Sequence, residues 1–470
     1  MTIKAKVDAI DRFVRTLKSG GLYDDIQAAC VMAGWTNLAG ALYPFKGSAP
    51  TNGGGLFQNA DLDPGIGLKG DGSTKYLDAN RAGNVDGQND IHLSVYIAAA
   101  SPKPYLVSNY SYLGALDATF YSRLNQGSDT SIAVSNVTGF VGASRQLAST
   151  ISTRLQQTTY ADTKASITPG TASFLAYRNT SGSSYSNATL SWYSIGSALD
   201  LAALDSAVST LMADLRAIDE DGFEPESVNY LRAVEDADGA YLETGVKKAI
   251  NRFIVGCKKD GIWDAIKSSC ILCGARTIAG ALVPLAGTAP TAVNFVSANY
   301  NRETGLVGVP ASGTYIDTNR ANDADGLNDI HLAVYKTSTG DDTAPWLIGS
   351  RDVSVPVSYI LVGSGGFFNR SPAAILSVDT SGTTGLRATL RSSPSSASVY
   401  YNGALTAVSS TSTAIDTSIN HFVFAYGSST GAVGKSNARL AFYSVGSSLS
   451  LSALDARVTT LVSQIAAAIP

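Results

Sequence analysis

The sequence is poor in the residues that most enzymes use for acid–base and nucleophilic chemistry. Its 470 residues contain three histidines, His92, His331 and His421, and six glutamates, at positions 220, 224, 226, 235, 243 and 303. Glycosidases flank the scissile bond with paired carboxylates. The aspartates that would have to supply them lie mainly beside Gly or Asn, where turn formation accounts for them. We therefore expect no catalytic residues, no histidine-based metal site and no enzyme activity.

Charge, cysteine and long apolar runs are also scarce. Charged residues make up 15% of the chain, the net charge is -4, and no basic run occurs, which argues against nucleic acid as a partner. No apolar run approaches the roughly 20 residues that span a bilayer, and we expect neither a membrane span nor a signal peptide. The four cysteines include Cys270 and Cys273 without a second pair nearby. They predict small buried side chains in a protein made in a reducing cytoplasm, with no zinc, redox or other cofactor.

The sequence does contain an internal duplication. Four motifs recur in the same order, displaced by 239 to 250 positions: residues 21–24 at 261–264, 40–44 at 280–284, 86–93 at 325–332, and 192–197 at 442–447. Between the copies lies an acidic stretch. This arrangement predicts a first domain over residues 1–216, an acidic linker over 217–243 with a short helix near 227–234, and a second domain over 244–470.

Each copy combines helical ends with a strand-rich middle. Apolar residues three and four apart predict an opening helix, and a second short helix is expected over 24–32 and 264–272. Alternation over 91–96 and the Asn402-Gly403 pair are typical of strands and a tight hairpin. A closing helix is expected after Asp200 or Ser450 as N-cap. The predicted class is all-β with flanking helices.

Three motifs then suggest a family: Trp263-Asp264 before a short helix, residues 70–78 (Gly-Asp-Gly-Ser-Thr-Lys-Tyr-Leu-Asp), and residues 193–196 (Tyr-Ser-Ile-Gly). Together they resemble a concanavalin/laminin-G-like jelly-roll domain of tailed-bacteriophage virion proteins, in two tandem copies. The resemblance implies two sandwiches in a virion structural protein, as capsid decoration or as a tail or fibre component. It also implies a multi-copy or homo-oligomeric assembly that contacts other virion proteins and is assembled in the cytoplasm of the host bacterium. The second copy departs from the motif over residues 309–315.

A carbohydrate-binding adhesin on a tail fibre or baseplate is the alternative function. Tyrosine rings can stack on sugars, and Tyr105, Tyr110, Tyr112 and Tyr121 cluster in a stretch of the first copy that is rich in Ser and Asn. These are the candidate glycan-stacking residues for a host surface glycan. A polysaccharide depolymerase is a weaker alternative, which the glutamate distribution disfavours.

Two further patterns recur in both copies. Oxygen-bearing side chains gather in one loop, at Asn84, Asp86 and Asp90 around Gly87, and at Asp323, Asp325 and Asp329 around Gly326. Laminin-G-like sandwiches can hold calcium, but the ends of a twelve-residue calcium loop are apolar here, which favours a plain turn.

His92 and His331 occupy the same place in the two copies. They predict a histidine that forms hydrogen bonds within a sheet.

Overall fold

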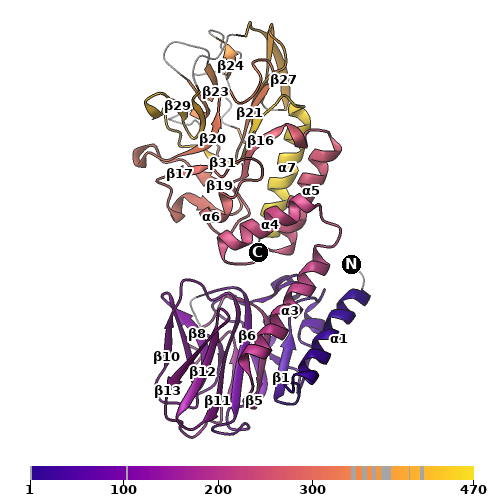
Figure 1. Ribbon diagram of the computed structural model, residues 1–470, viewed down its shortest axis with the longest axis vertical. Coiled ribbons are helices and arrows are strands. Elements are labelled where there is room, and N and C mark those ends of the chain that lie inside the picture. Colours follow the sequence, from indigo (N-terminus) through magenta and orange to yellow (C-terminus); the bar gives the residue numbers. More distant parts are fainter. Residues whose placement is uncertain are drawn as a thin grey trace. The chain divides into compact units, whose positions relative to one another are not determined.

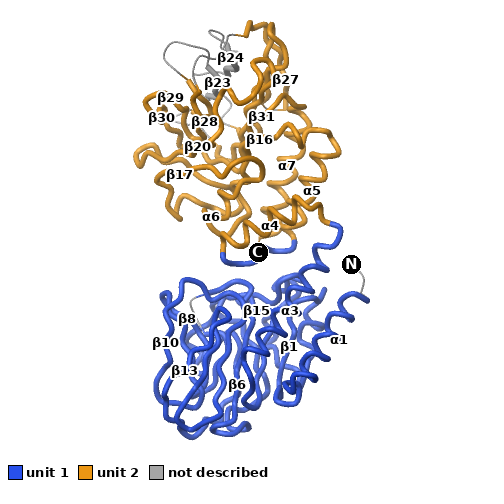
Figure 2. The backbone as a smooth tube through the Cα atoms, in the orientation of Figure 1, with its two compact units in different colours: residues 1–222, 239–244, 470 blue, residues 223–238, 245–469 orange. Residues whose placement is uncertain are grey.

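The computed structural model describes residues 3–101, 104–339, 346–351, 357–361, 367–371, 383–401, 403–412 and 418–469. The described chain forms two compact units (Figure 2). Unit 1 extends to Gly222 and also includes Gly239–Thr244, whereas unit 2 comprises Phe223–Asp238 and Gly245–Ile469.

Unit 1 is a sandwich of two antiparallel sheets (Figure 1). The strands of its first sheet run in the order β13 (Thr158–Thr163), β12 (Thr150–Leu155), β11 (Gly139–Leu147), β6 (Ile91–Ala99), β15 (Thr189–Gly196), β4 (Gly67–Lys69) and β3 (Leu62–Asp63), and β1 (Ile26–Val31) also pairs with β15. The second sheet runs β10 (Thr130–Ala133), β9 (Thr119–Leu124), β8 (Ser111–Leu116), β7 (Pro104–Val107), β14 (Ser173–Ala176), β5 (Leu77–Ala82) and β2 (Thr51–Asn52).

Unit 2 repeats the strand order of the first sheet and most of that of the second. Its first sheet runs β27 (Ala404–Ser409), β26 (Ser396–Tyr401), β25 (Gly385–Arg391), β21 (Ile330–Lys336), β31 (Arg439–Gly446), β19 (Gly305–Val307) and β18 (Tyr300–Asn301), and β16 (Ile266–Ile271) also pairs with β31. The second sheet runs β24 (Phe367–Ser371), β23 (Val357–Leu361), β22 (Trp346–Ser350), β28 (Asn420–Val423), β20 (Tyr315–Ala321) and β17 (Thr291–Val293). In addition, β29 (Tyr426–Ser428) pairs with β22 and with β30 (Gly431–Val433).

The predicted fold class is therefore confirmed: the structure is mostly β, with flanking helices and two tandem jelly-roll-like sandwiches. The predicted hairpin is also present, because Tyr401 of β26 pairs with Ala404 of β27. Asn402 of that turn lies outside the described residues.

Helices cover the first sheet of each unit. The α-helices are α1 (Ile3–Ser19), α2 (Leu38–Ala41), α3 (Leu201–Asp219), α4 (Pro225–Asp238), α5 (Thr244–Lys259), α6 (Ile278–Ala281) and α7 (Leu451–Ala468), and the 3-10 turns are η1 (Gly53–Gly55), η2 (Asn59–Asp61), η3 (Trp263–Ala265), η4 (Ser297–Asn299) and η5 (Pro310–Ser312). Asp200 and Ser450 cap α3 and α7 as predicted, since their side chains accept backbone N–H groups of the first turn. In unit 1 the pair α1 and α3 lies side by side (Figure 1). It packs Phe13 and Leu204 against Trp192 of the sheet.

The second short helix predicted over 24–32 and 264–272 is wrong. These segments form the strands β1 and β16, which pair with β15 and β31. In β1 one face packs between the sheets through Ala28 and Cys30, and the other packs under the helices through Ala29 and Val31. A strand buried on both faces has a continuous apolar sequence, which periodicity cannot distinguish from a buried helix.

The acidic segment 217–243, predicted to be a solvated linker, is largely helical. Its first residues end α3, and the helix expected near 227–234 is present as the longer α4. Tyr230, Leu231 and Val234 of α4 are buried in unit 2. In unit 1 the following segment is anchored by Tyr241, whose hydroxyl lies 2.9 Å from that of Tyr96.

Candidate binding surface

The histidines shared by the two copies join neighbouring strands within the first sheet of each unit. His92 Nδ1 lies 2.6 Å from the Ser197 carbonyl oxygen, and its Nε2 lies 3.0 Å from Ser194 Oγ. In unit 2 the matching distances from His331, to Ser447 O and Ser444 Oγ, are 2.6 and 2.8 Å. Burial lowers the pKa of both imidazoles to about 4, so that they are neutral at pH 7. The predicted hydrogen bonding of these histidines within the sheet is confirmed.

The repeated acidic loops are also built around internal partners. Arg81 Nε donates to Asp86 Oδ2 at 2.8 Å, and Arg320 Nε donates to Asp325 Oδ2 at 2.9 Å. Asp90 Oδ1 accepts the backbone N–H of Ala198 at 2.8 Å, which ties the loop to the segment before α3. In the described part of the chain, no group of three or more His, Cys, Asp or Glu side chains is placed to hold a metal ion. The geometry corresponds to the turn that the sequence favoured.

All four cysteines are free and buried. Burial raises the pKa of Cys270 and Cys273 to about 12, which keeps both as unreactive thiols at neutral pH. Cys270 Sγ lies 3.4 Å from the Tyr443 hydroxyl, inside the core of the sandwich.

The Gly-Asp-Gly loop of the first copy is organised by its own aspartate. Asp71 Oδ1 accepts the backbone N–H groups of Ser73, Thr74 and Lys75 at 2.8 to 3.0 Å. Burial alone would raise the pKa of Asp71, but these hydrogen bonds hold it below its ordinary value. The motif therefore stabilises a turn.

The four candidate tyrosines do not form one site. Tyr105 on β7 is fully buried, and its hydroxyl donates to the Ser101 carbonyl oxygen at 2.8 Å. We therefore remove Tyr105 from the predicted glycan-stacking set, since its ring has no exposed face. Tyr110, before β8, is 43% exposed, whereas Tyr112 and Tyr121 are half-buried. Sequence alternation could not reveal this difference, because the turn before β8 breaks the register.

Tyr112 and Tyr121 share the outer face of the second sheet of unit 1. Tyr112 pairs with Arg123 across β8 and β9, and Tyr121 pairs with Gly114, which has no side chain to cover the ring. The Arg123 guanidinium lies 5.3 Å from the Tyr112 ring centre and forms an ion pair with Asp129 at 2.6 Å. Burial, and then the Asp129 carboxylate, raise the pKa of Tyr112. We call Tyr112, Tyr121, Arg123 and Asp129 the tyrosine face.

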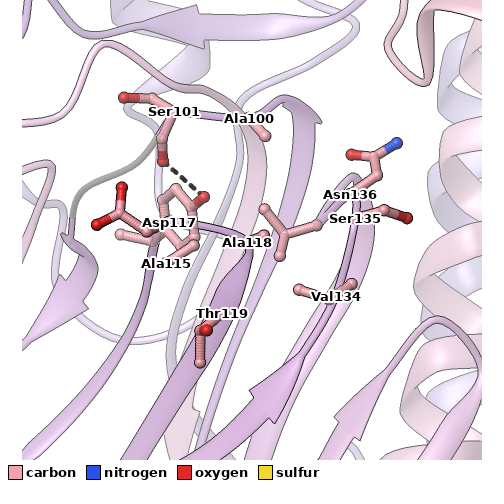
Figure 3. A pocket seen from close by; sticks show the side chains of 11 residues that line it. Ala100, Ser101, Ala115, Asp117, Ala118, Thr119, Val134, Ser135 and Asn136 are labelled. Atoms are coloured by element: carbon pink, nitrogen blue, oxygen red, sulfur yellow. Dashed lines mark hydrogen bonds between the residues drawn. The ribbon is translucent and has the colours of Figure 1, made fainter.

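A small pocket opens at the end of the same hairpin (Figure 3). Its volume is about 170 Å³, and it is lined by the β8–β9 turn, the loop after β10, Ala100, Ser101 and the buried Tyr105. The turn residues Asp117 and Ala118 have φ angles of 46° and 57°, a left-handed conformation that is unfavourable for alanine. Among the residues that the structure describes, no hydrogen-bond partner reaches the buried Ser101 Oγ. The pocket thus combines apolar walls with an exposed carboxylate and hydroxyl groups.

Sequence reasoning missed a second aromatic cluster in unit 1. The Arg178 guanidinium lies 4.4 Å from the centre of the Tyr76 ring and 5.7 Å from that of Tyr185. Arg178 and Tyr185 face each other across an isolated antiparallel bridge in one loop, whereas Tyr76 is distant in sequence and is brought to them by the pairing of β14 with β5. No sequence pattern available from one chain indicates this cluster.

Comparisons with known proteins find similar solved structures only. No family model matches the chain, and no curated protein matches it. The botulinum neurotoxin serotype D binding domain is 8% identical, with a TM-score of 0.32, over 92% of this chain and 98% of that chain. Trypanosoma rangeli sialidase is 9% identical, with a TM-score of 0.29, over 77% of this chain and 62% of the sialidase, so the match spans less than two thirds of the enzyme. Mouse laminin alpha1 domains LG4-5 are 12% identical, with a TM-score of 0.18, over 76% and 80% of the two chains.

No helix among the residues that the structure describes is long and apolar enough to cross a bilayer.

Proposed function

We propose that the chain is a non-catalytic structural protein of a bacteriophage particle, either a capsid decoration protein or a component of the tail or its fibres. In this role it binds other virion proteins. The phage assignment rests on the sequence resemblance over both copies. The proposal that the protein is non-catalytic rests on one observation: the histidines and arginine–aspartate pairs that recur in both copies form hydrogen bonds and ion pairs within the fold.

Both copies use the same polar residues for internal contacts. The neutral histidines His92 and His331 bridge neighbouring strands, and the repeated arginine–aspartate pairs close a turn. A histidine whose pKa is about 4 is a weak base at neutral pH. The polar residues that recur in both copies thus stabilise the sandwich, which is consistent with a domain that binds other proteins.

The duplication also supports a role in attachment or assembly. When two linked domains both bind, the second contact is intramolecular, and avidity can exceed either single affinity by roughly 10² to 10⁴. Weak contacts by each domain would then suffice in a multi-copy assembly.

The test is to locate the protein in purified particles. Heads and tails are separated and the chain is quantified by mass spectrometry in each fraction. We expect a stoichiometric, multi-copy signal in one fraction, and complete absence from particles would reject the proposal.

Catalysis is tested separately on the purified protein. We expect no release of reducing sugar from the host polysaccharide. Release that disappears on substitution of a single aspartate would contradict the non-catalytic assignment.

Glycan binding is the second candidate, favoured by the tyrosine face. Half-exposed tyrosine rings beside an arginine–aspartate pair offer both stacking and hydrogen bonds to sugar hydroxyls. The pocket at the end of the hairpin offers further hydroxyl groups within the same unit.

Binding of the full chain to host cells distinguishes the two candidates. If the face binds glycan, Tyr112→Ala and Tyr121→Ala should each weaken cell binding at least tenfold. Tyr160→Ala is the matched control, since Tyr160 is 39% exposed on β13 in the other sheet. Equal binding by all three variants would remove the tyrosine face as a glycan site.

A further inference from the structure

Unit 1 has an open apolar groove beside its first helix. We call it the α1 groove, and its volume is about 300 Å³. It is lined by Lys6, Val7 and Ile10 of α1, by residues 33–36 after β1, and by Leu215 of α3. Val7 is 56% exposed. A groove of this composition leaves apolar surface in contact with solvent.

The equivalent surface of unit 2 can be identified from the duplication. The displacement of 240 positions places Ile250 at the position of Ile10 and Gly274 at that of Gly34. Gly34 and Gly274 have the same left-handed conformation, with φ of 91° and 88°. A Cβ on Gly34 would touch Leu215, and one on Gly274 would touch Ile465, which follows Leu215 by 250 positions. The two surfaces therefore share one local geometry.

In unit 2 this surface is covered by α4. Glu235 of α4 forms an ion pair of 3.3 Å with Lys247 of α5, and both side chains are almost completely buried. Leu231 and Val234 of α4 are buried as well, and Ile250 of α5 is only 2% exposed. In unit 2, α4 is thus bound to α5 by a buried ion pair, whereas the equivalent side of α1 in unit 1 lines an open groove.

The end of α4 makes a second, more specific contact. The Asp238 carboxylate accepts the backbone N–H groups of Arg276 and Thr277 at 2.6 and 2.8 Å, and the Thr277 hydroxyl at 2.7 Å. The equivalent N–H groups in unit 1 belong to Thr36 and Asn37. Both residues are exposed, and within the described residues neither N–H has a hydrogen-bond acceptor.

We propose that the α1 groove binds an amphipathic helix of a partner protein that has the chemistry of α4. Such a helix carries large apolar residues at the positions of Leu231 and Val234, and a carboxylate at the position of Asp238, which would bind the N–H groups of Thr36 and Asn37. The spacing from 231 to 234 to 238 keeps these residues on one helical face. The source of the helix, another virion protein, rests on the proposed function.

Charge also favours this occupant. The helix α4 carries four acidic residues and one arginine, Arg232. Lys6 lies on the wall of the α1 groove, where its amine donates to the Gly34 carbonyl oxygen, and its positive charge complements an acidic helix of this kind.

The test uses the full-length protein and a synthetic peptide with the sequence of residues 223–240. Trp35 lines the groove, so binding is followed by Trp35 fluorescence and, independently, by calorimetry. Val7→Glu should weaken binding at least tenfold while leaving the fold intact, because Val7 is largely exposed. Peptides with Leu231→Ala or Asp238→Asn should bind at least tenfold more weakly.

Trp35→Phe is the matched control, which should lose the fluorescence change but keep the calorimetric binding. Absence of binding at millimolar peptide, or binding that Val7→Glu does not affect, would overturn the proposal. Self-association of the chain that Val7→Glu abolishes would also overturn it, because the occupant would then be a second copy. Peptide binding does not depend on location in a particle, so absence of the chain from virions would reject the proposed function alone.

Discussion

Acid sensitivity should follow from the two buried histidines. The pKa of His92 and of His331 is about 4 in the folded chain, against 6.5 for an ordinary histidine. As pH falls below 6.5, the unfolded chain takes up a proton on each imidazole before the folded chain does. The folded state is therefore favoured above pH 6.5, and this advantage is lost as pH falls toward 4.

The size of the effect follows from the shift. One pKa unit corresponds to about 1.4 kcal/mol, so each histidine should cost its unit about 2 kcal/mol at pH 5 and about 3 kcal/mol near pH 4. That loss is a large part of the 5 to 15 kcal/mol with which domains are typically stable. Both units should respond, because each contains one such histidine.

Urea unfolding between pH 7 and pH 4 measures this dependence, and the imidazole signals in NMR report the two pKa values directly. The controls are His92→Gln and His331→Gln. Each should lower stability at pH 7 by about 1 to 3 kcal/mol through lost hydrogen bonds, and should flatten the pH dependence of its own unit. If the pH dependence is unchanged in both variants, or if His92 and His331 titrate near 6.5, the reasoning fails.

Three further predictions follow from the described contacts. Arg81→Ala should destabilise unit 1 by about 3 to 5 kcal/mol, because it leaves the buried Asp86 carboxylate without its cation. Calorimetric unfolding measures this loss. If added calcium restores the stability, the loop is instead a metal site. Thiol titration should detect no fast-reacting cysteine in the native protein and four after denaturation, since all four are buried. Reaction of Cys270 with Ellman's reagent in the folded chain would contradict this. Ala118→Gly should raise the stability of unit 1 by up to about 1 kcal/mol, because glycine adopts the left-handed φ angle of this turn more easily than alanine. A loss of stability in thermal unfolding would show that the turn is not strained.

Local sequence determined much of the fold. The collinear motifs established the duplication, and the strand orders of the two first sheets agree with it. Asp200 and Ser450 could be identified as helix caps because capping depends on a few adjacent residues. The role of His92 was also predictable, since its place in an alternating strand pointed it away from the inter-sheet core.

Several features depended on packing between distant segments. β1 was mistaken for a helix because the terminal helices bury its second face, which removes the alternation of a half-exposed strand. Tyr105 and Tyr110 are close in sequence and similar in chemistry, yet one lies in the core and the other is exposed.

The acidic segment after α3 shows most clearly which properties the sequence determines and which depend on tertiary structure. Its sequence alone determined that it is polar and has the apolar spacing of a short helix, because both are properties of neighbouring residues. Only the tertiary structure decided that α4 covers the surface around Ile250, because burial depends on which element packs against it. The open α1 groove is visible for the same reason: its residues come from α1, the loop after β1, and α3, and the fold brings these three segments together.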